Sequence, residues 1–304
     1  MSVLLELRDI VRGFGGAAPV LNGVTLSVKR EEIVGLLGRN GAGKSTLLHV
    51  AMGMLHPHAG TVRVFGLAPT EHPVAVKRRI GYVAEDQVLP PSAKISDLLA
   101  LHRKLFPSWD AALERQLMDR FGLRDQGRRM YSLSKGEARQ VALICAVCHR
   151  PELLILDEPA GGLDPAARRE FLETSIQLLN REGTSIIFSS HHMGDVERLG
   201  GRVALLDGGT IKLDTQLDVL REEYCVAVVQ RAPGLDQAAL ARLPQCLRVR
   251  TVGNALHAVF HGQPKLMQWQ LRDALGVVDA PCQRVPLEEL FVELVGAEHL
   301  GKAS

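Results

Sequence analysis

One stretch of the chain combines glycines, a lysine and a serine in the spacing of a phosphate-binding loop. It fits the pattern G-x-x-x-x-G-K-[ST] followed by a threonine, and its members are Gly38, Arg39, Asn40, Gly41, Ala42, Gly43, Lys44, Ser45 and Thr46. Glycines let successive backbone N–H groups point at a phosphate, and a helix N-terminus adds partial positive charge. We expect Lys44 to neutralise the β- and γ-phosphates and the Ser45 hydroxyl to ligate Mg²⁺. The pattern therefore predicts a site for a nucleoside triphosphate.

The elements around this loop favour that interpretation over an ordinary glycine-rich turn. The apolar run Ile33–Leu37 predicts a buried strand directly before the loop, and Lys44–Val50 predicts the start of a helix after it. Strand, loop and helix in this order are the context that a phosphate loop requires.

Two adjacent carboxylates and a histidine follow two other apolar runs. Asp157 and Glu158 come directly after Leu153–Leu156, and His191 follows a strand-like run that ends in two serines. Ligands bind where buried parallel strands end. We expect Asp157 to hold Mg²⁺, Glu158 to accept a proton from the attacking water, and His191 to hold the γ-phosphate and the water in line. The alternatives are a solvated strand end with two surface acids and a histidine that is only a satisfied polar residue.

The alternation of strand-like and helical stretches predicts the α/β class. Continuously apolar runs at 153–156, 185–188 and 203–206 predict a parallel sheet covered on both faces. Helical spacing over about 95–149 predicts a helical insertion into this core, and a further helix is expected from Pro165 to Asn180. Shorter strands are expected at 4–11, 24–28, 61–65 and 80–83.

The segment from about residue 224 onward predicts a separate small α+β domain. Its β-α-β-β-α order, with a short terminal helix at 287–295, resembles a ferredoxin-like sandwich. We expect the domains to cover 1–223 and 224–304, with the helical subdomain at about 88–150 of the first.

Composition narrows the function classes. The 304 residues carry a net charge of +2 and only 4% aromatics, which argues against a nucleic-acid partner. The N-terminus lacks the features of a signal peptide, and no apolar run approaches the roughly 20 residues that span a bilayer, so we expect a soluble, cytoplasmic protein. The five cysteines fit reduced thiols. Cys145-Ala146-Val147-Cys148-His149 matches a haem-attachment pattern, but we interpret it as core-facing residues of a helix.

Taken in order, these motifs resemble the ATP-binding subunit of an ABC transporter over about residues 1–223. That family has a P-loop NTPase (RecA-like) core with N-terminal antiparallel strands and a helical insertion. Its L-S-G-G-Q signature begins a helix and binds the γ-phosphate of ATP held by the opposite subunit. Here Leu133 is followed by Ser134, Lys135, Gly136 and Glu137, so Lys135 and Glu137 depart from the family pattern. We expect Ser134 to cap the helix and Gly136 to allow close approach to the phosphate.

The resemblance also assigns residues outside these motifs. The segment Ala160–Asp164 matches the family's D-loop, which runs across a dimer interface, and Phe14 matches the aromatic that stacks on adenine. His191 matches the switch histidine better than His192 does. Glu85 stands where the family has the Q-loop glutamine, so the resemblance implies a catalytic and Mg²⁺-directed role for Glu85, with Gln87 as the competing assignment.

The implied function is the ATP-hydrolysing motor of a transporter, with ATP and Mg²⁺ bound between two copies or two paired ATPase subunits. A separate multi-span permease would place it on the inner face of the cell membrane. Glu85, the L-S-K-G signature and the ending Pro286–Leu294 resemble the exporter subgroup. The alternatives are a soluble ABC ATPase that acts on ribosomes or DNA, and a P-loop kinase. The transported substance and the role of the terminal domain are not encoded in readable motifs.

Overall fold

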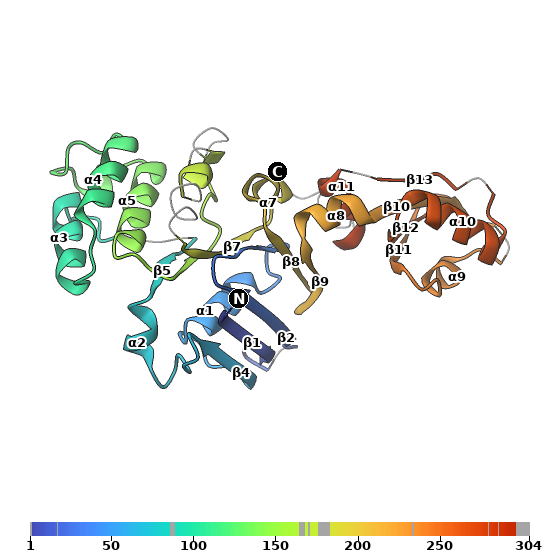
Figure 1. Cartoon of the computed structure of the whole chain (residues 1–304), viewed down its shortest axis with the longest axis horizontal. Coiled ribbons are helices and arrows are strands. Elements are labelled where there is room, and N and C mark those ends of the chain that lie inside the picture. The colour runs from blue at the N-terminus through green and yellow to red at the C-terminus, as the bar shows by residue number, and fades with distance from the viewer. Residues whose placement is uncertain are drawn as a thin grey trace. The chain divides into compact units, whose positions relative to one another are not determined.

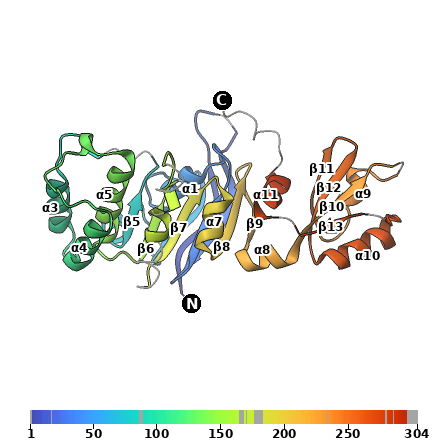
Figure 2. The ribbon, with the colours of Figure 1, turned by 90° about the horizontal axis from the view of Figure 1, so that it is seen from above.

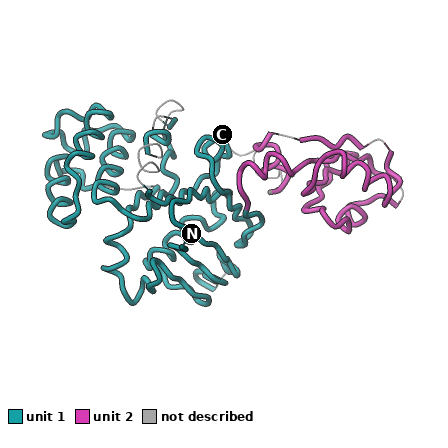
Figure 3. The backbone as a smooth tube through the Cα atoms, in the orientation of Figure 1, with its two compact units in different colours: residues 1–214 teal, residues 215–304 magenta. Residues whose placement is uncertain are grey.

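The protein is represented by a computed structural model that describes residues 2–16, 18–85, 89–163, 168–169, 171–175, 183–232, 234–278, 280–284 and 286–295. It divides into two compact units, residues 1–214 and 215–304 (Figure 3). This division lies ahead of the one expected after residue 223, so α8 (Leu217–Glu223) is grouped with the second unit.

A largely parallel sheet forms the centre of the first unit. Its strands run in the order β5-β6-β7-β3-β8-β9, with bounds β3 (Ile33–Leu37), β5 (Ile80–Val83), β6 (Leu153–Leu156), β7 (Ser185–Ser190), β8 (Arg202–Asp207) and β9 (Thr210–Gln216). Strand β3 pairs in parallel with β7 and β8, and β6 pairs in parallel with β5 and β7. Every residue of β3 and β6 is buried, as expected of strands covered on both faces.

An antiparallel sheet and one helix complete the core around the predicted phosphate loop. The sheet has the order β2-β1-β4, with β1 (Val3–Arg12), β2 (Leu21–Lys29) and β4 (Ala59–Val64). Helix α1 (Lys44–Ala51) follows β3, and its Leu47 packs in one apolar cluster with Leu5 of β1 and Leu36 of β3. The helix is therefore held between the two sheets, and the loop before it is anchored at both ends (Figure 1).

Helices gather beside β5, at one edge of the parallel sheet (Figures 1 and 2). They are α3 (Ile95–Leu105), α4 (Ala111–Arg120), the short 3₁₀ helix η1 (Met130–Ser132) and α5 (Lys135–Val147). Helices α2 (Pro73–Lys77) and α7 (Met193–Leu199) also belong to this unit. Cys145 and Cys148 are buried at the end of α5, in agreement with core-facing positions. Gln87, Asp164 and most of the helix expected from Pro165 lie outside the described residues, although 168–169 and 171–175 are helical.

The second unit is a small α+β domain built on an antiparallel sheet. Its strand order is β11-β12-β10-β13, with β10 (Tyr224–Gln230), β11 (Cys246–Val252), β12 (Ala255–His261) and β13 (Cys282–Gln283). Its helices are α9 (Gln237–Ala241), α10 (Pro264–Leu275) and α11 (Leu287–Val295), besides α8. The predicted fold class, an α/β core with N-terminal antiparallel strands and a small α+β domain, is confirmed.

Candidate active site

The phosphate loop lies between β3 and α1 and depends on glycine at two positions. Gly43 has φ +102°, in the region that favours glycine, and an added Cβ would lie 2.9 Å from the Leu21 side chain. At Gly38 an added Cβ would lie 2.5 Å from the carbonyl oxygen of Leu206 on β8. The loop therefore keeps its path because no side chain separates it from the neighbouring strands.

A pocket of about 540 Å³ opens over this loop, within the roughly 300–1,000 Å³ typical of small-molecule sites. It brings together residues from three separate predicted motifs: the phosphate loop, Glu85 after β5, and Glu158 after β6. The lining residues are Val20, Asn40, Gly41, Gly43, Lys44, Ser45, Thr46, Glu85 and Glu158. Val20 could not be predicted as a lining residue from the sequence, because a single valine belongs to no motif that indicates chemistry.

Lys44 is held at the centre of the loop. Its side chain is buried, and Nζ donates hydrogen bonds to the carbonyl oxygens of Gly38 at 2.8 Å and Arg39 at 3.1 Å. Nζ also lies 3.0 Å from Glu158 Oε1. The phosphate loop therefore fixes the position of the buried ammonium group, and the Glu158 carboxylate balances its positive charge.

Glu158 connects the phosphate loop with the end of β7. It is buried, with 4% of its surface exposed, and its second carboxylate oxygen, Oε2, lies 2.9 Å from His191 Nδ1. Burial acts to raise the pKa of this carboxyl, but the His191 hydrogen bond and the Lys44 charge outweigh burial, and the pKa of Glu158 is lowered. The group is therefore an ionised acceptor at neutral pH.

Asp157 is oriented by a serine that sequence reasoning had treated only as a neighbour of His191. Ser189 Oγ donates a hydrogen bond to Asp157 Oδ1 at 2.6 Å, and it accepts one from the Glu158 backbone N–H at 2.7 Å. Burial and the charge of Asp157 raise the pKa of nearby Tyr82 to about 12. Ser189 thus fixes both acidic residues relative to β7.

The two histidines after β7 differ in their partners. His191 contacts Glu158 through Nδ1, whereas the His192 backbone N–H donates to Ser190 Oγ at 3.0 Å. The rings lie 3.9 Å apart, and burial together with the neighbouring His191 lowers the pKa of His192. The geometry therefore brings His191 to the acidic pair.

The oxygen donors around the pocket are of the kind that Mg²⁺ takes in nucleotide sites. Among the described residues, no group of three or more His, Cys, Asp or Glu side chains could hold a metal alone. Mg²⁺ bound with a nucleotide uses only one or two protein ligands, with waters and phosphates completing its shell. The Ser45 hydroxyl on the pocket wall and the Asp157 carboxylate after β6 fit that requirement.

The predicted signature lies at the N-terminus of α5. Ser134 Oγ accepts a hydrogen bond from the Glu137 N–H at 3.2 Å, and Glu137 Oε2 accepts one from the Ser134 N–H at 2.8 Å, which makes a capping box. The hydrogen bond from Arg128, followed by that from the Ser134 backbone, lowers the pKa of Glu137 to about 2. Lys135 is exposed, and an added Cβ at Gly136 would meet Leu163 at an ordinary 3.6 Å.

Phe14 lies in the loop between β1 and β2, with 47% of its surface exposed. The Arg12 guanidinium carbon lies 4.9 Å from the ring centre. Among the described residues that line the 540 Å³ pocket, Phe14, Asp157, His191 and the signature residues are absent.

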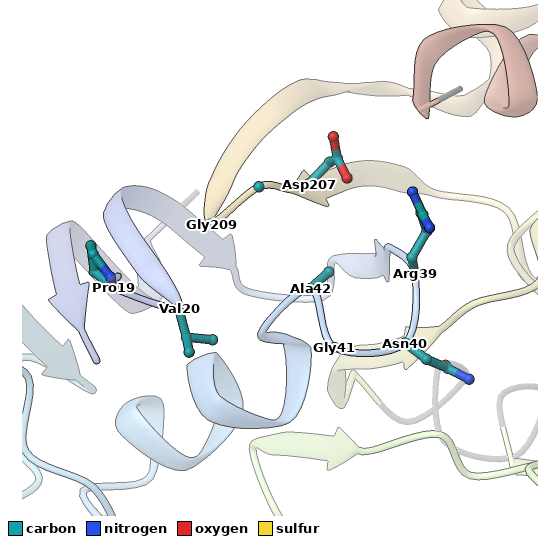
Figure 4. Close-up of a pocket in the computed structure, with 9 residues that line it drawn as sticks. Pro19, Val20, Arg39, Asn40, Gly41, Ala42, Asp207 and Gly209 are labelled. Carbon is teal, nitrogen blue, oxygen red and sulfur yellow. The ribbon is translucent and has the colours of Figure 1, made fainter. Parts of the chain in front are cut away.

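A second pocket of about 280 Å³ lies on the phosphate loop and shares Val20, Asn40 and Gly41 with the first (Figure 4). Its other lining residues are Pro19, Arg39 and Ala42 and residues 207–209 at the end of β8. Arg39 and Ala42 thus line the smaller pocket, and Lys44, Ser45 and Thr46 line the larger one.

Comparison with known proteins agrees with this geometry. The family described as "ABC transporter" matches residues 21–161. The ABC transporter ATP-binding protein YtrB of Bacillus subtilis is 31% identical over 221 residues, which are 73% of this chain and 75% of that protein. The chain belongs to the ABC transporter ATP-binding proteins. The Nod factor export ATP-binding protein I of Rhizobium etli is 31% identical over 301 residues, 97% of this ABC protein and 94% of that one. The linearmycin resistance ATP-binding protein LnrL of Bacillus subtilis is 29% identical and covers 96% and 98%.

Solved structures agree with the fold of this ABC ATPase. A chain described as the ATP-binding subunit of an ABC transporter has a TM-score of 0.65 and 33% identity, covering 72% of this chain and 92% of that one. The family membership predicted from the motif order is confirmed, and with it the binding of ATP and ATPase activity.

Proposed function

We propose that this ABC ATPase drives a transporter by pairing with a second ATPase subunit, most simply its own copy, around two molecules of ATP. The observation that carries the proposal is that the Glu158 carboxylate contacts Lys44 through one oxygen and His191 through the other. A cation, a base and a second polar group in contact are what phosphoryl transfer to water needs.

The chemistry follows from the contacts. Lys44 exchanges its carbonyl partners for the β- and γ-phosphate oxygens, while His191 holds the γ-phosphate and the nucleophilic water in line. The water oxygen attacks the γ-phosphorus, the bond to the ADP oxygen breaks, and the water proton passes to Glu158. Because the pKa of Glu158 is lowered, the carboxylate is ready to accept at neutral pH.

Mg²⁺ would be held by Ser45 and Asp157, with Glu85 on the same pocket wall as a further oxygen donor. When bound, it neutralises charge on the β- and γ-phosphates. The loop residues Gly38, Arg39, Asn40, Gly41, Ala42, Gly43 and Thr46 would cradle the phosphates through backbone N–H groups and the Thr46 side chain. Phe14 would stack on adenine.

The second subunit would supply Ser134, Lys135, Gly136 and Glu137 to the γ-phosphate. A serine hydroxyl has one donor and two acceptor lone pairs. Ser134 Oγ accepts from the Glu137 N–H in the capping box, so its O–H remains able to donate to a phosphate. The capped helix and the phosphate contact are compatible.

We further propose an exporter with a separate multi-span permease, which would hold the protein on the cytoplasmic face of the membrane. Within the described residues, no helix is long and apolar enough to cross a bilayer. Relatives named for Nod factor export and for daunorubicin resistance support the direction of transport. The small second domain, whose β-α-β-β-α-β order supports a ferredoxin-like description, would regulate the motor or bind a partner.

Glu158→Gln tests the proposal. It removes the proton acceptor but keeps the shape, so phosphate release should fall at least about 100-fold while ATP affinity is retained. Light scattering with and without ATP should then show an ATP-dependent pair. The matched control is Glu152→Gln at the opposite end of β6, where Glu152 pairs with Arg30 and Arg79, and turnover should stay within about twofold. Normal phosphate release by Glu158→Gln refutes the base, and failure to pair refutes the dimer.

A further inference from the structure

Arg139 joins the helix that carries the signature to the two loops that carry the pocket's acidic residues. It lies on α5, five residues after Ser134. Its Nη1 donates hydrogen bonds to the carbonyl oxygens of Pro159 at 3.0 Å and Gly161 at 2.6 Å, and Nη2 donates to the carbonyl oxygen of Glu85. One side chain therefore contacts the backbone after β5 and the backbone after β6.

The guanidinium group is suited to this arrangement. It is planar, permanently charged and carries five N–H donors in fixed directions, whereas a lysine ammonium is a compact point charge. Three carbonyl oxygens on two different loops thus converge on one rigid fork. Because the guanidinium donors point in fixed directions, these contacts orient the two loops relative to each other.

The loop after β6 needs such support because Glu158 adopts an unfavourable backbone conformation. Its φ is +43°, in the left-handed region that non-glycine residues rarely occupy. The turn is closed by a hydrogen bond from the Gly161 N–H to the Glu158 carbonyl oxygen at 2.9 Å. Pro159 and Gly161, which bond Arg139, belong to this same turn.

We propose that Arg139 is a positioning residue that holds the Glu158 turn and links its position to that of α5. This inference rests on the proposed role of Glu158 as the base. A shift of α5 when its N-terminus engages a phosphate would pull on the carbonyls of Pro159 and Gly161 and thereby move the Glu158 carboxylate. The backbone of Glu85 would follow, because the same guanidinium holds it.

Arg139→Lys and Arg139→Gln test the proposal in two measurements. The first is hydrogen exchange of peptides covering 83–85 and 157–163 in the protomer without nucleotide. Both variants should exchange about tenfold faster there, because the carbonyl contacts are lost. The second is steady-state ATP hydrolysis, in which kcat should fall about 100-fold with KM within twofold, as expected for a misplaced catalytic group. Arg150→Lys is the matched control, because Arg150 follows α5 and bonds Asp110 on the surface.

Each outcome decides the matter. Arg139→Lys keeps the charge and suits a helix, so it provides a folded variant if Arg139→Gln unfolds. Full activity of Arg139→Lys, or unchanged exchange of 157–163, overturns the positioning role. Faster exchange with a selective loss of kcat supports it. Normal phosphate release by Glu158→Gln, in a protein with Arg139 unchanged, would refute Glu158 as the base, whereas the exchange result on the protomer would still decide whether Arg139 holds the turn.

Discussion

The N-termini of α1 and α5 are both proposed to bind phosphate, yet they are built differently. At α1, the N-cap is Gly43 in a left-handed conformation, and among the described residues no side chain caps the helix. Its first residue, Lys44, is buried. At α5, Ser134 and Glu137 satisfy each other in a capping box, and Ser134 and Lys135 are exposed.

The difference indicates that α1 is a preformed site and α5 is a completed helix end. Uncapped N–H groups and a buried ammonium at α1 favour an anion within one protomer. At α5 the carboxylate of Glu137 already compensates the helix dipole and is itself paired with Arg128 at 2.6 Å. This exposed end is where the proposed second subunit would place its phosphate.

Lys44→Ala tests the α1 side and should have the largest effect. It removes the buried cation and leaves the Glu158 carboxylate without its 3.0 Å partner, so kcat/KM for ATP should fall about 1,000-fold. Kinetics and equilibrium binding of labelled ATP would measure this. Lys29→Ala, an exposed lysine at the end of β2, is the control and should change neither. ATP affinity within twofold of the unmodified protein would contradict a preformed site at α1.

Ser134→Arg tests the α5 side. A bulky cation at the exposed helix end should block pairing and lower turnover about 100-fold, because the γ-phosphate loses its second set of donors. ATP affinity of the protomer should stay within twofold. Light scattering and binding on the same sample separate the two effects. If the variant still pairs on adding ATP, α5 is not the second phosphate site.

Phe14→Ala sharpens the description of the α1 side by separating base from phosphate recognition. Loss of stacking should weaken ATP binding about 2- to 12-fold, corresponding to about 0.5–1.5 kcal/mol. Binding of tripolyphosphate, which has no base, should be unchanged. Phe14→Tyr serves as the conservative control. Equal weakening for both ligands would show that Phe14 acts on the loop rather than on adenine.

Glu137→Gln sharpens the α5 side and should have the smallest effect. The pKa of Glu137 is lowered to about 2, so its stabilising contribution is present above the unfolded value near 4.5 and is lost as pH falls toward 2. Solvent screening limits it to about 0.5–1 kcal/mol. Urea unfolding should show the two proteins differing at pH 7 and converging near pH 2. A difference independent of pH would rule out the charge as its source.

Local sequence patterns predicted most of the fold and most of the residues of the candidate site. The apolar runs that became β3, β6 and β7 were readable because strands buried on both faces need continuous apolar residues. The phosphate loop was readable because its chemistry depends on residues adjacent in sequence. Contacts through Ser189 and Arg139 were not readable, because a serine or arginine has no fixed partner until distant segments are packed.

The sequence by itself determined the family, the order of the motifs and the residue types available for ATP chemistry. Only the tertiary structure decided which of them meet. Glu158, which follows β6, contacts Lys44 at the start of α1 and His191 after the end of β7. The left-handed φ of Glu158 and the convergence of three carbonyl oxygens on Arg139 likewise arise only in the folded chain. The reason is physical, since motifs are local in the chain, whereas distances and burial arise when strands from distant segments align in one sheet.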